Sequence, residues 1–152
     1  ETLDLKGDVC VDKVLGSAIL FKKKDIEKIG FFDENFFLYY EDDDLCRRIK
    51  KINMSVIQII DAKAQHIHGH SKVKNKLKRT FIRNYHFTYD ELYYYFKNAK
   101  HYEKFNDLKK KIPNYLIKII INFFIFRFNQ SIYYFSKTMA FYRFTKFLKK
   151  SS

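Results

Sequence analysis

The chain has 152 residues, of which 47% are hydrophobic and 19% are Phe or Tyr, with only four glycines and one proline. This composition supports an ordinary domain with a core, and it excludes disordered, collagen-like and linker classes. The two cysteines, Cys10 and Cys46, are far apart and lack metal-site spacing. They are therefore expected to be reduced thiols of an intracellular protein, used as small apolar residues.

The net charge of +13 is concentrated in the second half of the chain. Residues 1–71 hold 11 Lys and Arg against 13 Asp and Glu, a net of −2, whereas residues 72–152 hold 19 against 4, a net of +15. This shift predicts two parts, residues 1–72 and residues 73–152. A block as basic as the second part favours a polyanionic partner, either an anionic membrane surface or nucleic acid.

The first part of the chain predicts strands joined by short helices. Residues 11–21 are rich in β-branched and aliphatic side chains and predict a strand in which Gly16 permits a close backbone approach. Residues 25–29 predict a short helix that Gly30 ends. Residues 41–52 predict a second helix, whose acidic first turn suits the positive end of the helix dipole.

Two further strands are predicted before the basic part begins. Residues 54–60 have the composition of a buried strand, and residues 63–67 predict a short second one. The latter leads into a loop with three alternating histidines, His66, His68 and His70, which alone are a weak signal for a metal site.

The basic part predicts helices. From residue 72 apolar side chains recur at four-residue spacing, a capping box at residues 88–91 predicts a second helix to residue 96, and residues 101–111 predict a third. Pro113 either breaks the chain or opens the next helix. The apolar run 115–126 is shorter than the ~20 residues of a membrane span. With residues 132–148 it fits either an interfacial helix with snorkelling cations, or a helix packed on the core or on a partner subunit.

Six carboxylates surround a block of aromatic residues in the stretch 30–48. Asp42 lies two residues after Tyr40, at the start of the predicted helix, so it is a candidate general base for a hydroxyl nucleophile. Arg47 and Arg48 either pair with the acids or meet a diphosphate. An EF-hand is excluded, since no Gly and no further oxygen ligands follow at the required spacing. The alternative is a solvated acidic helix cap.

Several spaced motifs occur together in one order, and this order is more specific than any single motif. They are Gly16-Ser17-Ala18, Ile29-Gly30-Phe31-Phe32-Asp33-Glu34, Phe37-x-Tyr39-x-Glu41-Asp42-x-Asp44-Leu45-Cys46-x-Arg48-Ile49 and His66-x-x-Gly69-x-Ser71. Over residues 9–72 this string resembles the C-terminal half of the catalytic domain of family-2 inverting glycosyltransferases, above all the rhamnosyltransferase-like bacterial members. Asp43 departs from it, because the family usually has an apolar residue there.

The resemblance implies an α/β fold: the C-terminal portion of a GT-A type domain, followed by a basic, mostly α-helical tail. It also implies transfer of a sugar, rhamnose by the closest likeness, from a nucleotide-diphosphate donor to a glycan or lipid-linked acceptor. Asp42 would be the general base, and Glu41 and Asp44 would orient the site, with Asp44 tied to Arg48.

The remaining site residues expected from the resemblance are Gly16, close to donor or acceptor, Asp33 and Glu34 beside the acceptor, and His66 near a metal-diphosphate. A divalent Mn²⁺ or Mg²⁺ is expected in the intact enzyme. The family's N-terminal half, with its Asp-x-Asp metal motif, has no counterpart in this sequence. The chain is therefore expected to be a fragment or a truncated enzyme.

These observations favour a glycosyltransferase of surface-polysaccharide or lipid-linked glycan synthesis, cytoplasmic and peripheral at the inner face of the membrane. The main alternative is a non-catalytic basic helical module that binds an anionic membrane surface or nucleic acid, although a nucleic-acid partner would leave the acidic stretch unexplained. A third hypothesis is that the tail packs on a copy of itself to form a homo-oligomer.

Overall fold

The computed structural model describes residues 7–65, 73–98 and 101–151. The chain divides into two compact units. Of the described residues, the first unit contains 7–35 and 40–65, and the second contains 36–39, 73–98 and 101–151. The short segment 36–39 thus belongs to the second unit, although both of its flanks belong to the first.

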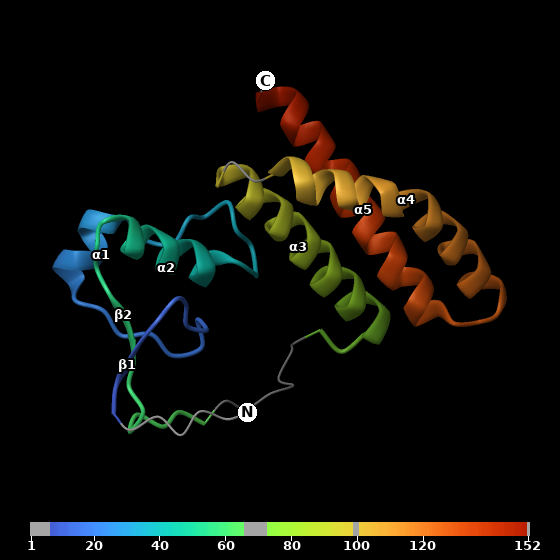
Figure 1. Ribbon diagram of the computed structural model, residues 1–152. Helices are drawn as coiled ribbons and strands as arrows, with labels where there is room; N and C mark the ends of the chain where they lie inside the picture. The colour runs from blue at the N-terminus through green and yellow to red at the C-terminus, as the bar shows by residue number, and fades with distance from the viewer. Residues whose placement is uncertain (1–6, 66–72, 99–100, 152) are drawn as a thin grey trace. The chain divides into compact units, whose positions relative to one another are not determined.

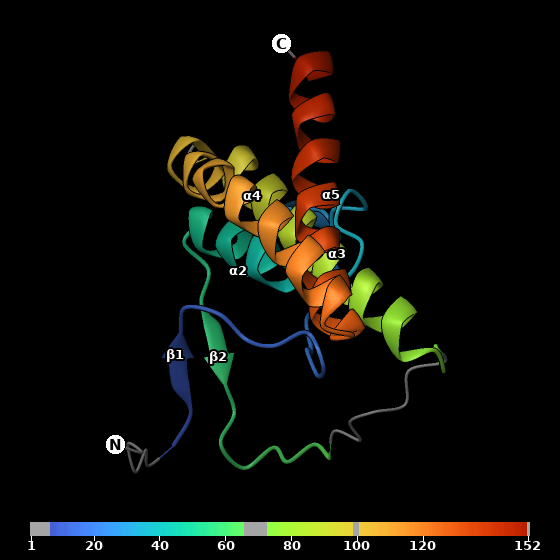
Figure 2. The same ribbon diagram turned by 90° about the vertical axis from the view of Figure 1, so that its right-hand side faces the viewer.

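The first unit is built on a two-stranded antiparallel sheet and two helices. Strand β1 (Val9–Val11) pairs with strand β2 (Val56–Gln58), with Cys10 opposite Ile57, and the two strands lie side by side in Figure 2. Helices α1 (Lys23–Ile29) and α2 (Glu41–Lys51) lie between the strands in the sequence.

The core of the first unit is small. Ile26 of α1, Leu45 and Cys46 of α2, and Val56 of β2 are its buried apolar residues. Gly30 caps α1 with φ of 82°, a left-handed backbone that a side chain would strain. The predicted helices at 25–29 and 41–52 and the predicted role of Gly30 are therefore confirmed.

The predicted strand at residues 11–21 is wrong. β1 ends at Val11, and no regular structure follows until α1. Leu15 and Leu20 are largely exposed, so the apolar residues of this stretch have no second layer to pack against. The predicted strand at 54–60 exists but is shorter, and residues 63–65 of the next predicted strand are not extended in a sheet.

The second unit consists of three long helices: α3 (Lys76–Lys97), α4 (His101–Phe124) and α5 (Phe128–Ser151). Figure 1 shows α4 and α5 joined by a tight turn, with α3 alongside. The Asn75 side chain caps α3 by accepting from the Lys78 N–H at 3.0 Å. In the described ranges, no helix is both long and apolar enough to cross a membrane.

Aromatic rings form the core of the second unit. Phe144 of α5 is fully buried and makes edge contacts with Tyr89 and Phe96 of α3 and a tilted contact with Phe105 of α4. Ring centroid separations of 5.9 to 6.3 Å are typical of favourable aromatic pairs. This cluster explains why so many Phe and Tyr residues occur in a strongly basic sequence.

Two helix boundaries predicted for this unit are wrong. Thr88 does not start a new helix, since it lies buried in the middle of α3, where packing overrides its capping preference. Pro113 neither breaks the chain nor opens a helix but lies inside α4. Ring contacts of Phe105 with Phe141 and of Tyr115 with Tyr134 hold α4 against α5 on both sides of Pro113, which offsets the backbone hydrogen bond that a proline removes.

Candidate functional site: the acidic turn of helix α2

Four acidic residues, Glu41 to Asp44, form the first turn of α2 and are called the acidic turn below. Tyr40 precedes them as N-cap in a left-handed conformation, with φ of 67°, and its carbonyl accepts from the Asp44 N–H at 2.9 Å. Because the first turn of a helix has unpaired backbone N–H groups and positive partial charge, it stabilises carboxylates placed there. The structure therefore places the acids where the sequence predicted them.

Asp42 is held by two backbone N–H groups. Its Oδ2 atom accepts from Gly16 N–H at 2.8 Å, and its Oδ1 atom accepts from Asp43 N–H at 2.8 Å. Each carboxylate oxygen retains a further lone pair, so both bonds orient the group without exhausting its acceptor capacity. The side chain is half-buried. The structure thus brings together Gly16 and Asp42, which are 26 residues apart in the sequence.

The next two aspartates bind cations instead. Asp43 pairs with Lys13, whose Nζ lies 3.1 Å from Oδ1, and Asp44 pairs with Arg48, whose Nε lies 2.8 Å from Oδ2. These ion pairs offset the like-charge repulsion between the consecutive carboxylates. The predicted Asp44–Arg48 pair is confirmed, whereas the partner of Asp43 was not predicted.

Arg48 ties the loop after α1 to α2. Besides its bond to Asp44, its guanidinium donates to the carbonyl oxygens of Ile29, Gly30 and Phe31 at 2.7 to 2.9 Å. Four hydrogen bonds thus engage a fork that has five N–H donors. Through these bonds Arg48 holds the loop after α1 against the acidic turn. A contact of Arg48 with substrate stays a prediction.

Asp33 and Glu34 lie in the turn after α1. The Asp33 Oδ1 atom accepts from the backbone and side-chain N–H groups of Asn35, at 3.0 and 2.7 Å, which is an Asx-turn arrangement. Glu34 is exposed in the same turn. Glu41 is half-buried at the first position of α2. Roles for these three residues with an acceptor stay predictions.

The described residues do not provide a metal site. His66, the predicted ligand, lies outside them, and within residues 7–65, 73–98 and 101–151 no three His, Cys, Asp or Glu side chains are grouped to hold an ion. In the acidic turn, Asp42 binds backbone N–H groups, while Asp43 and Asp44 bind cations. This donor set does not fit a divalent cation by itself.

Asp90 is a polar residue of the second unit whose role was not foreseen. It is fully buried in α3, and its Oδ2 accepts from the backbone N–H groups of Leu38 and Tyr39, both at 3.1 Å. Burial raises the pKa of Asp90, whereas those N–H donors and His86 lower it. In the sequence Asp90 belongs to the predicted capping box, and its partners are 51 and 52 residues away.

The segment held by Asp90 also contributes aromatic contacts to the second unit. Phe36 is buried, with its ring 5.0 Å from that of Tyr93, and Phe37 stacks on His86 at 4.0 Å while 67% exposed. Burial lowers the pKa of His86, opposed by Asp90. The structure leaves Phe37 exposed on one face.

Comparison with known proteins gives one partial relative. Over 54 residues the chain is 37% identical to the low-salt glycan biosynthesis hexosyltransferase Agl10 of Haloferax volcanii. The match covers 34% of this chain and 18% of the relative, so the chain spans less than a fifth of that protein's length. No family model and no solved structure matches. The similarity indicates a relation to glycosyltransferases over that stretch.

Proposed function

We propose that this chain is part of an inverting glycosyltransferase of the GT-A type, and that Asp42 is its general base. The partial identity to a hexosyltransferase supports the reaction class. The observation that carries the role of Asp42 is its position: a half-buried carboxylate at a helix N-terminus, oriented by the N–H groups of Gly16 and Asp43.

The chemistry asks for an ionised carboxylate with a free lone pair at a fixed place. The helix N-terminus favours the negative charge, and the two backbone bonds fix the direction of the carboxylate. Asp43 and Asp44 each form an ion pair with a cation, so their carboxylates are already engaged. Among the three aspartates of the acidic turn, Asp42 therefore fits a base best.

In the proposed reaction, an acceptor hydroxyl gives its proton to a carboxylate oxygen of Asp42 while its own oxygen bonds to the anomeric carbon of the donor sugar. The bond from that carbon to the diphosphate oxygen breaks on the opposite face. Its electron pair leaves with the nucleoside diphosphate, and the configuration at the anomeric carbon inverts. No step is assigned to a metal, since the described residues do not form a site for one.

The proposed donor and acceptor rest on the family resemblance of residues 9–72. The donor is a nucleotide-diphospho-sugar, with rhamnose the first sugar to test, and the acceptor is a glycan or a lipid-linked glycan. Gly16, Asp33 and Glu34 are proposed to lie along the substrates, with Glu41 and Asp44 orienting the base. The assay is run once with Mn²⁺ or Mg²⁺ and once with a chelator, because a metal is expected for the family.

The test is the rate of nucleoside diphosphate release by the full-length protein with a panel of nucleotide-sugars and glycan acceptors. Asp42→Asn is expected to lower kcat by about 10²–10⁴, the usual contribution of a general base. Asp43→Asn is the matched control: it removes the neighbouring charge, which pairs with a largely exposed lysine, and should leave the rate nearly unchanged. An Asp42→Asn enzyme with full activity would contradict the proposal.

A further inference from the structure

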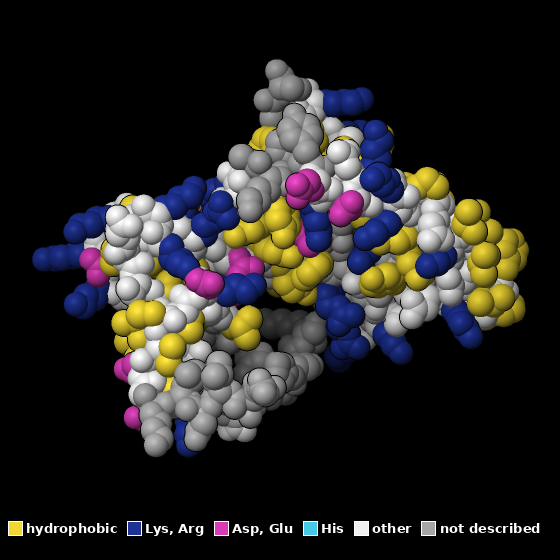
Figure 3. All heavy atoms as spheres, viewed as in Figure 1, with side chains coloured by type: hydrophobic (Ala, Val, Ile, Leu, Met, Phe, Trp, Pro, Cys, Tyr) yellow, Lys and Arg dark blue, Asp and Glu magenta, His cyan; other side chains and the backbone are white. Residues whose placement is uncertain are grey.

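The α4–α5 turn bears an exposed apolar surface. Between Leu116 and Phe128, the exposed apolar side chains include Ile117, Ile120, Ile121, Phe124, Phe126 and Phe128; this surface is called the apolar tip. Figure 3 shows a hydrophobic cluster at the end of the helical unit where Figure 1 places this turn. Phe126 is 80% exposed and Phe124 is 72% exposed.

The C-terminal half of α4 is apolar on the face it turns to solvent. Leu116, Ile120 and Phe124 recur at four-residue spacing, and Ile117 and Ile121 recur beside them, which places all five along one side of the helix. A helix that packs only on its own unit would present polar residues on this side. Exposed apolar patches of this kind mark interaction surfaces.

The tip is a fixed structure. The Arg127 N–H donates to Asn122 O at 2.8 Å, and the Ser131 hydroxyl donates to Ile119 O at 2.9 Å, which ties the start of α5 to α4. Phe126 has a left-handed backbone, with φ of 59°. The turn therefore holds its aromatic rings outward and does not bury them.

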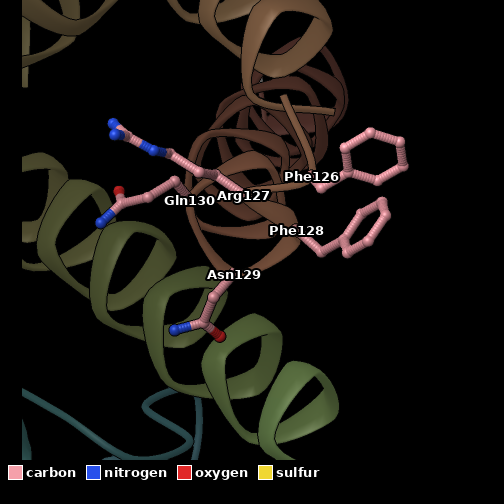
Figure 4. A pocket seen from close by; sticks show the side chains of 5 residues that line it. All are labelled: Phe126, Arg127, Phe128, Asn129 and Gln130. Carbon is pink, nitrogen blue, oxygen red and sulfur yellow. The ribbon is translucent and has the colours of Figure 1, made fainter. Parts of the chain in front are cut away.

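The rings and the polar groups of the turn point in different directions. In Figure 4 the rings of Phe126 and Phe128 lie on one side, Arg127 and Gln130 extend to the other, and Asn129 points toward α3. The two ring centroids are 6.0 Å apart, beside a shallow hollow of about 340 Å³. Hydrophobic and cationic side chains are thus sorted as an interfacial element requires.

Cations flank the tip on α3. The Thr80 hydroxyl donates to the Asn129 side chain at 2.8 Å, which fixes the first turns of α3 beside the start of α5. Lys76, Arg79 and Arg83 are exposed within about one turn of Thr80.

Cations also flank the tip on α4, and acids are absent from this end of the sequence. Lys109, Lys110 and Lys111 are exposed, between one and two turns before the apolar face begins at Leu116. Residues 108–152 contain ten Lys and Arg and no Asp or Glu. An apolar surface within such a cationic border complements an anionic lipid surface.

We propose that the apolar tip inserts into the interfacial region of an anionic membrane, while the surrounding lysines and arginines bind lipid headgroups. A second copy of the chain is a poorer occupant, because two such cationic borders would repel each other. Nucleic acid is also poorer, because isoleucine and leucine side chains form most of the exposed face of α4 and do not stack on bases. The proposal does not depend on the transfer reaction, since membrane binding is measured without donor or acceptor.

The first experiment is sedimentation of the full-length protein with phosphatidylcholine vesicles, with and without one-fifth phosphatidylserine. Binding should require the anionic lipid, and each Lys→Gln change at Lys109, Lys110 or Lys111 should lower the partition coefficient about fivefold. The double variant Phe124→Ser/Phe126→Ser should lower it by about tenfold or more. Leu20→Ser, at a 95% exposed site of the first unit, is the control and should bind as wild type does.

A second readout reports insertion directly. The chain contains no tryptophan, so Phe126→Trp supplies a single probe. Its emission should shift to the blue on anionic vesicles and be quenched by brominated acyl chains, whereas Leu20→Trp should show neither effect. Equal binding to neutral vesicles, unchanged binding of the double variant, or an unshifted emission spectrum of the Phe126→Trp variant would overturn the proposal. So would binding to an oligonucleotide alone, or a dimer that the double variant dissociates without any vesicle binding.

Discussion

Replacement of Arg48 by alanine is expected to lower the free energy of unfolding of the first unit far more than replacement of a comparable surface cation. Arg48 and Asp44 are an i,i+4 pair on α2, with exposed side-chain fractions of 20% and 2%. Arg48→Ala would leave a buried carboxylate without its cation and three carbonyl oxygens without their donor. Breaking a buried pair in this way costs about 3–5 kcal/mol.

The chain offers a control with the same spacing. Lys23 and Glu27 are an i,i+4 pair on α1 at 3.8 Å, but their side chains are 84% and 50% exposed. Lys23→Ala should cost no more than about 0.5 kcal/mol. Arg48→Lys should fall between the two, at about 2 kcal/mol, because an ammonium group cannot reproduce the planar fork.

The assay is urea unfolding of the full-length chain followed by circular dichroism, with hydrogen exchange of α2 amides to localise the effect. A gap of about 3 kcal/mol between Arg48→Ala and Lys23→Ala is expected. Equal losses in the two variants would refute the view that Arg48 clamps the loop after α1 onto α2.

Three further predictions concern single residues. Because the pKa of Asp90 is raised in the folded state, its stabilising contribution is complete below the unfolded pKa of about 3.9 and is lost as pH rises through the folded pKa. Asp90→Asn should remove this pH dependence from the free energy of unfolding. The same pH dependence in the variant would exclude Asp90 as its source. Gly30→Ala should cost about 1–2 kcal/mol in urea unfolding, because φ is 82° there, and no loss would show that the loop relaxes. Gly16→Ala should change the free energy of unfolding by no more than about 1 kcal/mol. It should nevertheless slow sugar transfer, because the added methyl group would lie 3.4 Å from Asp42 Oδ2. An unchanged transfer rate would place Gly16 away from the reacting groups.

Local patterns in the sequence predicted the acidic end of the first unit well. The helix at 41–52 and its acidic first turn depend on residues within a few positions of one another. The Asp44–Arg48 pair was expected only from the family resemblance, and the structure shows it as an i,i+4 pair on α2. Gly30 likewise marks a helix end through its own backbone freedom. Such features follow from helix geometry and capping, which a sequence displays directly.

Features that depend on long-range packing were missed. The expected strand at 11–21 has the right composition but no partner layer, so its Gly16 N–H binds Asp42 and not a neighbouring strand. The bonds from Leu38 and Tyr39 to Asp90 span 51 and 52 residues, and no local pattern announces them. Pro113 shows the same effect, because packing along α4 overrides its local preference to end a helix.

The most direct test of the central claim is the anomeric configuration of the transferred sugar. The full-length protein would be incubated with a nucleotide-diphospho-sugar of known anomer and a glycan acceptor, and the anomeric configuration of the new linkage would be read by nuclear magnetic resonance. A single displacement with Asp42 as base predicts a product of the opposite anomeric configuration. A product that retains the donor's configuration would contradict the account, as would the absence of transfer from every donor in the panel.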